Sequence, residues 1–142
     1  FPGLEYSATV RTAEYSMRRD FRPDRRSLVT APALALTAPV VDASDPLVEG
    51  VLLRSAGGKQ RAVTLANWAY ATGATATDAR GREKKRIAHS PIENVKVTIH
   101  GAGKVDRATS CMLQKQLEVT TTGDTVTFTL PRLEEGDVVV LE

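Results

Sequence analysis

Few residues in this chain of 142 are of types and spacings that could perform chemistry. Its two histidines, His89 and His100, lack a second ligand at metal-site spacing, and no glycine-rich phosphate loop or serine-elbow motif occurs. Glu134 and Glu135 are adjacent in an expected turn, so their side chains should diverge, whereas paired catalytic carboxylates face one another across a glycosidic bond. The sequence therefore predicts no catalytic residue, no metal and no cofactor.

The single cysteine, Cys111, excludes an internal disulfide and a cysteine-based zinc site. It lies in an alternating stretch of polar and apolar residues, where a lone cysteine is usually a small buried hydrophobe. We therefore expect Cys111 to be buried and unreactive.

Two aromatic residues are candidates for ligand binding. Trp68 is the only tryptophan of the chain, and Tyr70 follows it at the spacing of one strand face. Together they could form a small platform on which a sugar ring stacks, on the face opposite Val63 and Leu65. The alternative is that Trp68 caps the core at the rim of the fold.

A basic segment is the second candidate. Residues 71–92 are long for a hairpin connection and carry an excess of positive charge. We interpret them as a long loop ending in an extended, solvated hairpin tip. The alternative is a site for a polyanion or a protein, whose contacts would be Arg82, Lys84, Lys85 and Arg86.

The elements that must position these residues are strands. Val95, Val97 and Ile99 alternate with polar residues, and the same pattern recurs over residues 47–55, 60–70 and 115–142, with glycine turns between. The last stretch is expected to be an antiparallel meander in which Pro131 ends one strand and a final buried strand follows Gly136. No window has a helical period. The pattern predicts an all-β antiparallel sandwich of about seven to nine strands in two sheets.

Composition and domain organisation set further expectations. A net charge of +2 does not indicate a nucleic-acid partner, and no apolar run is long enough to cross a membrane. Residues 1–45 are rich in proline and are expected to be a linker or edge-strand segment, whereas residues 46–142 form the sandwich. The start at Phe1, without a signal-peptide pattern, suggests a piece of a larger or processed protein. The sequence does not indicate a compartment.

Three segments together resemble a known family. They are residues 63–68 (VTLANW), 94–101 (NVKVTIHG) and 125–142 (TVTFTLPRLEEGDVVVLE). They are similar to the C-terminal β-sandwich of large bacterial glycoside-hydrolase-related proteins of the β-galactosidase-like kind. The resemblance covers residues 45–142 and is most specific in the last twenty, but the family has a short turn where this chain has residues 71–91.

In that family, a catalytic (β/α)₈ barrel and a glutamine-amidotransferase-like domain precede a small immunoglobulin-like domain. The resemblance therefore implies an immunoglobulin-like sandwich with an accessory, non-catalytic role. Its partners would be the preceding domains of the same polypeptide, with contacts between copies of the chain as a further option. Carbohydrate binding through Trp68 and Tyr70, and polyanion or protein binding through residues 80–86, remain the alternative functions.

Overall fold

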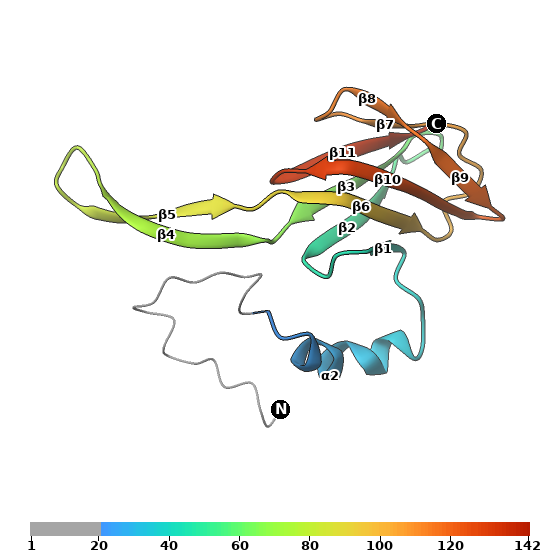
Figure 1. Ribbon diagram of the computed structural model, residues 1–142. Coiled ribbons are helices and arrows are strands. Elements are labelled where there is room, and N and C mark those ends of the chain that lie inside the picture. Colours follow the sequence, from blue (N-terminus) through green and yellow to red (C-terminus); the bar gives the residue numbers. More distant parts are fainter. Residues whose placement is uncertain (1–20) are drawn as a thin grey trace.

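A computed structural model describes residues 21–142, except for the side chains of residue 29, residues 72–76 and residues 84–87. Within this range, eleven strands form three antiparallel sheets, and one helix precedes them. Two sheets pack as a β-sandwich, and the third extends away from it as a two-stranded arm (Figure 1). The predicted all-β antiparallel sandwich is confirmed. The strand number exceeds the expected seven to nine because several strands have only three or four residues and the arm adds two more.

Each sheet of the sandwich combines strands that are distant in the sequence. The four-stranded sheet has the order β1 (Val41–Ala43), β6 (Ile92–Ile99), β10 (Thr125–Leu133) and β9 (Val119–Thr122). The five-stranded sheet has the order β2 (Val48–Arg54), β3 (Arg61–Asn67), β11 (Gly136–Leu141), β7 (Ala108–Ser110) and β8 (Lys115–Leu117). All pairings are antiparallel.

The core lies between these two sheets and follows the alternation in the sequence. Every second residue of the central strands points inward, because successive side chains of a strand alternate between the faces of its sheet. The inward residues include Val63, Leu65, Val95, Val97, Ile99, Val126, Phe128, Leu130, Val139 and Leu141, all buried. Burying one such side chain stabilises the fold by about 1.5–3 kcal/mol. The faces predicted for residues 95–99 and 126–130 are therefore confirmed.

The predicted terminal meander is wrong in its pairing. β10 belongs to the four-stranded sheet and β11 to the five-stranded sheet, so the chain crosses between the layers at Glu134 and Glu135. β11 pairs instead with β3 and β7. It is also buried on one face only, since Val139 is inside and Val138 is exposed. Local alternation defines a strand but not the neighbour beside which it lies.

Pro131 does not end its strand, contrary to the sequence expectation. β10 continues through it to Leu133, and the ladder with β6 has partners on both sides of the position. The residue that faces Pro131 in this register, Asn94, has a φ of 53°. Asparagine tolerates this left-handed conformation better than most residues. The two irregularities coincide, so the missing N–H of Pro131 interrupts the ladder only locally.

A helix that the sequence pattern did not predict precedes the sandwich. α2 covers Pro23–Leu34, with Pro23 in the first turn, where proline is tolerated because that N–H has no helical partner. The helix has no continuous apolar stripe, and it buries little apolar surface against the sandwich. Leu28, for example, is 80% exposed. One link to the sandwich is the hydrogen bond from the Arg26 guanidinium to the Pro46 carbonyl, 2.8 Å long. The part of the proposed N-terminal segment before residue 21 lies outside the described residues.

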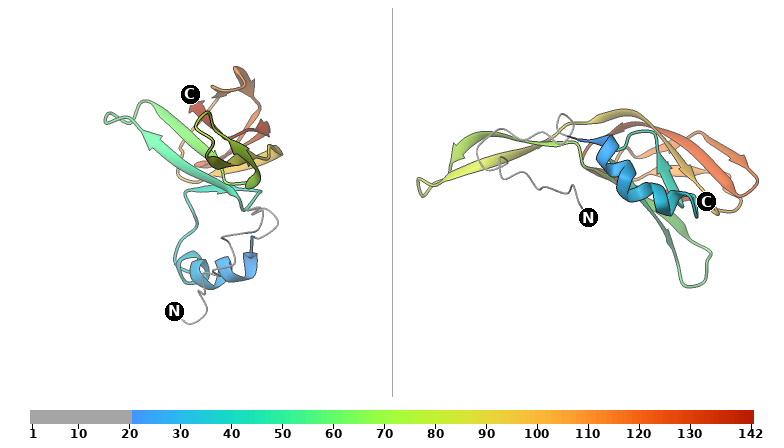
Figure 2. Two further views of the ribbon diagram at one scale, coloured as in Figure 1. Left: turned by 90° about the vertical axis from the view of Figure 1, so that its left-hand side faces the viewer. Right: turned by 90° about the horizontal axis from the view of Figure 1, so that it is seen from below.

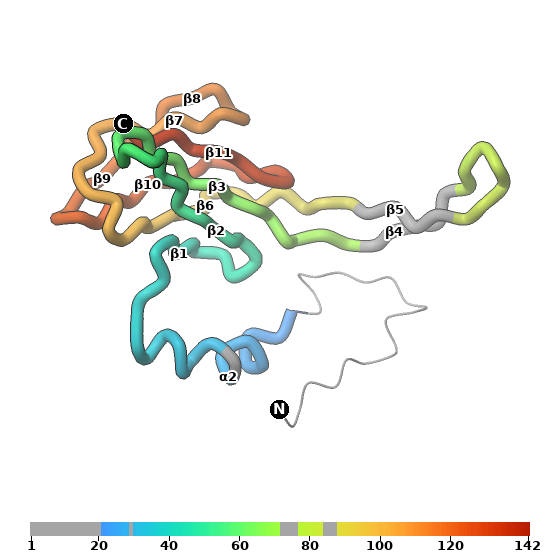
Figure 3. Tube along the Cα trace, turned by 180° about the vertical axis from the view of Figure 1, so that it is seen from behind, coloured from blue at the N-terminus to red at the C-terminus, as the bar shows by residue number. Residues whose placement is uncertain are grey.

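The segment interpreted as a long loop forms the arm. β4 (Tyr70–Thr77) pairs with β5 (Glu83–His89), from Tyr70 opposite His89 at the root to Thr77 opposite Glu83 near the tip. Figures 2 and 3 show the arm extending from one end of the sandwich, away from the other two sheets. At about 3.3 Å per residue, seven steps along β4 place the tip roughly 20 Å from the root.

Candidate functional site

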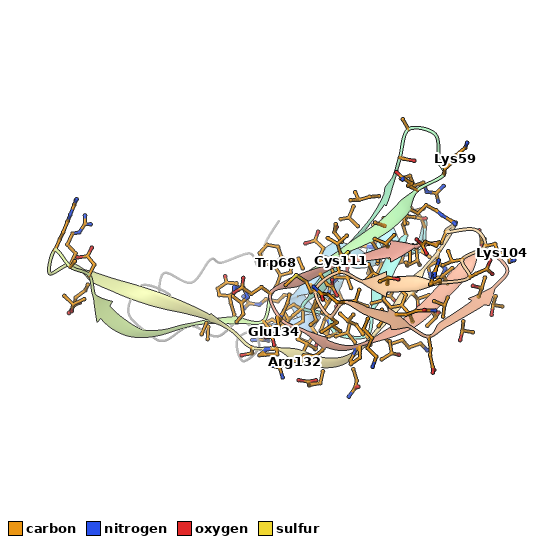
Figure 4. All side chains as sticks on the ribbon, turned by 90° about the horizontal axis from the view of Figure 1, so that it is seen from above. Lys59, Trp68, Lys104, Cys111, Arg132 and Glu134 are labelled. Carbon is orange, nitrogen blue, oxygen red and sulfur yellow. The ribbon has the colours of Figure 1, made fainter. Side chains whose placement is uncertain are left out.

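The chain leaves the sandwich at a corner between β3 and β4, where polar and aromatic residues gather. Val63, Leu65 and Ala69 are buried beneath this corner, whereas the intervening Trp68 is 47% exposed. Figure 4 shows Trp68 at the end of the sandwich from which the arm leaves, with Arg132 and Glu134 nearby. Trp68 thus lies on the surface of the rim and not within the core.

Asn67 fixes this corner through its buried side chain. Its amide nitrogen donates hydrogen bonds to the carbonyl oxygens of Ser90, at 2.9 Å, and of Glu134, at 2.6 Å. Its amide oxygen accepts one from the Ala69 N–H, at 2.8 Å. A single buried side chain therefore joins the start of the arm, its end and the crossover from β10 to β11.

The indole of Trp68 is also held in place. Its Nε1 donates a hydrogen bond to Glu49 Oε2, at 3.0 Å, and its backbone N–H donates to the Leu47 carbonyl, at 2.8 Å. An exposed aromatic ring with a bonded edge keeps one orientation, and its free surface can contact a partner without a large loss of conformational entropy.

A surface hollow of about 460 Å³ lies beside Trp68. It is lined by Ala66, Asn67, Trp68, Tyr70, His89 and Glu135. Tyr70 and His89 are cross-strand partners whose ring centroids are 6.2 Å apart at an interplanar angle of 52°. Trp68 and Tyr70, the aromatic candidates from the sequence, therefore share one hollow. His89 and Glu135, which the sequence did not connect with them, also line it.

The two adjacent glutamates, Glu134 and Glu135, differ in their charged neighbours. Arg132 forms ion pairs with Glu134, at 2.5 Å, and with Glu93, at 2.8 Å. Hydrogen bonding to Glu134, followed by its charge and the weaker influence of Glu93, raises the pKa of Arg132 above its ordinary value. No hydrogen bond or ion pair to the Glu135 carboxylate occurs among the described residues. Glu135 lines the hollow, and its carboxylate can accept hydrogen bonds from a ligand.

The basic candidates lie at the other end of the arm. Arg82 forms a 3.0 Å ion pair with Asp78 at the tip and is separated from the hollow by the length of β5. Lys84, Lys85 and Arg86 belong to β5, but their side chains lie outside the described ones. The structure therefore does not bring the basic candidates together with Trp68 and Tyr70.

A third feature is the outer face of the five-stranded sheet, which is apolar although solvent reaches it. Val51, Leu53 and Val138 are 50%, 49% and 40% exposed. The ladder aligns Val51 with Thr64 and Val138 in one row, and Leu53 with Ala62 and Val140 in the next. We call these two rows the apolar face.

Cys111 contradicts its predicted burial. It is exposed, because β7 ends at Ser110 and the buried positions of that strand are Ala108 and Ser110. Its N–H donates to the Val138 carbonyl, beside the apolar face. Within residues 21–142, no group of three or more histidine, cysteine, aspartate or glutamate side chains could hold a metal ion. In the same range, no helix has the length and apolar character needed to cross a membrane.

Comparison with known proteins finds similarity among solved structures. No protein-family model matches the chain, and no curated protein sequence matches it. Among solved structures, α-L-fucosidase isoenzyme 2 from Paenibacillus thiaminolyticus is similar, with a TM-score of 0.56 and 21% sequence identity over 81% of this chain. The match spans 17% of the fucosidase chain. At this identity the likeness shows a shared fold.

Proposed function

We propose that this chain is an accessory, non-catalytic β-sandwich domain of a larger carbohydrate-active protein, of the immunoglobulin-like class. Its role is to pack against another domain of the same polypeptide and to stabilise it. The observation that carries this proposal is the apolar face of the five-stranded sheet.

The apolar face is unusual for a surface sheet. An antiparallel sheet with one solvated side normally presents polar residues there, as the outer side of the four-stranded sheet does. In that sheet, Thr127 faces Thr98 on one side and Thr120 on the other. Contiguous apolar residues on an otherwise polar surface commonly mark a site where another protein domain packs. The contrast between the two outer faces supports packing through the five-stranded sheet.

The structural likeness supports the larger context. A solved chain that shares this fold is named an α-L-fucosidase, and the match occupies less than a fifth of its length. A sandwich of this size within a longer enzyme fits an accessory part better than a complete catalytic unit. The sequence resemblance to a C-terminal sandwich of glycoside-hydrolase-related proteins also supports an accessory role within a larger protein.

The test compares two matched charged variants in two polypeptides. The chain alone, and the longer polypeptide that contains it, are each produced with Leu53→Lys plus Val138→Lys, or with Thr120→Lys plus Thr122→Lys on the outer side of the four-stranded sheet. All four positions are exposed, so the chain alone should lose no more than about 0.5 kcal/mol per substitution. In the longer polypeptide, only the apolar-face variant should make this domain unfold in a separate, earlier calorimetric transition.

Two results would overturn the proposal. One is an equal response of the longer polypeptide to both variants, since packing through the apolar face requires a difference. The other is glycoside hydrolysis by the chain alone that a point substitution within residues 21–142 abolishes, because the domain would then be catalytic.

A further inference from the structure

We propose that the hollow at the root of the arm binds one neutral pyranose ring of a carbohydrate. The ring would stack on Trp68, while His89 and Glu135 would form hydrogen bonds to its hydroxyl groups. This inference rests on the hollow alone and does not depend on packing through the apolar face.

The shape and lining of the hollow fit a sugar. Its volume of about 460 Å³ falls within the roughly 300–1,000 Å³ that is usual for small-molecule sites. One wall is the half-exposed indole of Trp68, a flat apolar surface that matches the C–H groups on one side of a pyranose. Tyr70 and His89 also line the hollow, and their ring planes are tilted by 52° to one another. Aromatic side chains from the rim of the sandwich and from the root of the arm therefore line the same hollow.

The polar groups of the hollow fit hydroxyl groups and disfavour a negative ligand. The carboxylate of Glu135 accepts hydrogen bonds only, and the imidazole of His89 can both donate and accept when neutral. Neutral sugar hydroxyls supply the complementary donors and acceptors. A carboxylate or sulfate on the sugar would instead be repelled by Glu135 and by Glu49, which holds the indole edge. The favoured ligand is an uncharged pyranoside.

The groups that line the site are held by hydrogen bonds within the chain. Glu49 fixes the indole of Trp68, and Asn67 fixes the backbone on both sides of the corner. The hydrogen bond between the Ser90 N–H and the Ala69 carbonyl, 2.7 Å long, closes the root of the arm. Affinity is gained when the binding groups need little ordering, so this rigidity favours binding at a small site.

The experiment uses the fluorescence of Trp68, which is the only tryptophan in the chain, so that a change in emission reports on the surroundings of this indole. The full chain is titrated with methyl pyranosides of fucose, galactose, glucose and xylose, and with methyl glucuronide as the charged comparison. We expect a saturable change in fluorescence for at least one neutral sugar. Half-saturation should occur at roughly 1 mM, as is usual for a ligand of about a dozen non-hydrogen atoms. Methyl glucuronide should bind at least fivefold more weakly, and added salt should leave neutral binding unchanged.

The variants are matched in position and charge. Glu135→Ala should weaken binding at least fivefold, whereas Glu134→Ala should not, because the adjacent Glu134 carboxylate pairs with Arg132 and does not line the hollow. Trp68→Ala should weaken binding at least tenfold by calorimetry, and Trp68→Phe should restore part of it. A thermal unfolding curve for each variant confirms that it is folded.

Three outcomes would overturn the inference. They are the lack of a saturable response to every neutral pyranoside up to 100 mM, equal losses in Glu134→Ala and Glu135→Ala, and undiminished binding in folded Trp68→Ala. None of these outcomes would contradict packing through the apolar face, which the two-polypeptide comparison tests separately.

Discussion

At the scale of single residues, Asn67 joins more separate segments through its side chain than the other residues of the corner do. It is 3% exposed, yet its side chain has partners on both its nitrogen and its oxygen. A buried amide stabilises a fold only when its hydrogen bonds are made, because an unmet buried group costs about 1–3 kcal/mol. Removing the amide would leave the Ala69 N–H and the Ser90 and Glu134 carbonyls without this partner.

The first prediction concerns Asn67→Ala. We expect a loss of about 3 kcal/mol in the free energy of unfolding, from the lost hydrogen bonds and the small cavity. Urea denaturation followed by circular dichroism measures it. Gln116→Ala, at an exposed position of β8, is the control and should change the value by less than about 0.5 kcal/mol. A loss below 1 kcal/mol in Asn67→Ala would show that the corner does not depend on this amide.

The second prediction concerns pH. Arg22 donates hydrogen bonds to the Asp24 carboxylate at 2.9 and 3.1 Å, and this bonding is the main reason that the pKa of Asp24 is lowered. Since the pKa is lower in the folded protein, the interaction favours the fold at pH values above the ordinary pKa of about 3.9, and its contribution is lost as the pH falls below it. The Arg22→Ala variant should raise the pKa of Asp24, as measured by carboxyl NMR titration. An unchanged pKa would show that the pair does not form in solution.

At the scale of elements, the arm stands apart from the sandwich. β4 and β5 pair with each other and with no strand of the other two sheets. An isolated two-stranded hairpin is only marginally stable in water. The arm therefore contributes little to the sandwich beyond its root.

The third prediction is that the sandwich folds without the arm. Replacing residues 71–88 by Asn-Gly joins Tyr70 to His89, which are already opposite one another, through a two-residue turn. The unfolding temperature of the shortened chain should stay within about 5 °C of the original. A loss of cooperative unfolding, as followed by calorimetry, would show that the arm supports the core.

The fourth prediction concerns the charge of the arm. Residues 77–89 hold Arg80, Arg82, Lys84, Lys85 and Arg86 against Asp78 and Glu83, an excess of three positive charges. If the arm binds an acidic partner, replacing Lys84, Lys85 and Arg86 by glutamine should weaken retention on heparin and reduce its dependence on salt. The matched control replaces three lysines outside the arm by glutamine: Lys59 and Lys104 (Figure 4), and Lys115 in β8. Equal weakening in both variants would mean that net charge alone governs retention.

At the scale of the whole molecule, the two outer faces of the sandwich differ in kind. Thr98, Thr120 and Thr127 form a polar row on one sheet, and the apolar face covers the other. A molecule with one apolar and one polar side should associate through the apolar side when its partner is missing.

The fifth prediction follows from this asymmetry. The chain alone should self-associate with increasing concentration in sedimentation velocity, because association removes Val51, Leu53 and Val138 from water. The variant with Leu53→Lys and Val138→Lys should remain monomeric, whereas the variant with Thr120→Lys and Thr122→Lys should associate as the original chain does. Association that persists in the apolar-face variant would assign the contact to another surface.

The sequence by itself determined the class of fold and the direction of many side chains. Alternation over residues 95–99 and 126–130 was sufficient, because the period of two is a property of a single strand. The glycine at 123, with a φ of 63°, likewise marks its turn locally. The unpredicted helix α2 is the converse case, since an exposed helix leaves no apolar period to detect.

Only the tertiary structure decided which strands are neighbours and which side chains meet. The pairing of β3 with β11 joins residues 70 to 80 positions apart, and nothing local to either strand selects the other. The hollow exists because the arm register brings His89 beside Tyr70, and the crossover at residues 134–135 brings Glu135 to the same corner. Trp68 and Tyr70 could be found from their spacing alone, but His89 and Glu135 could not, because their proximity depends on long-range pairing and on the burial of Asn67.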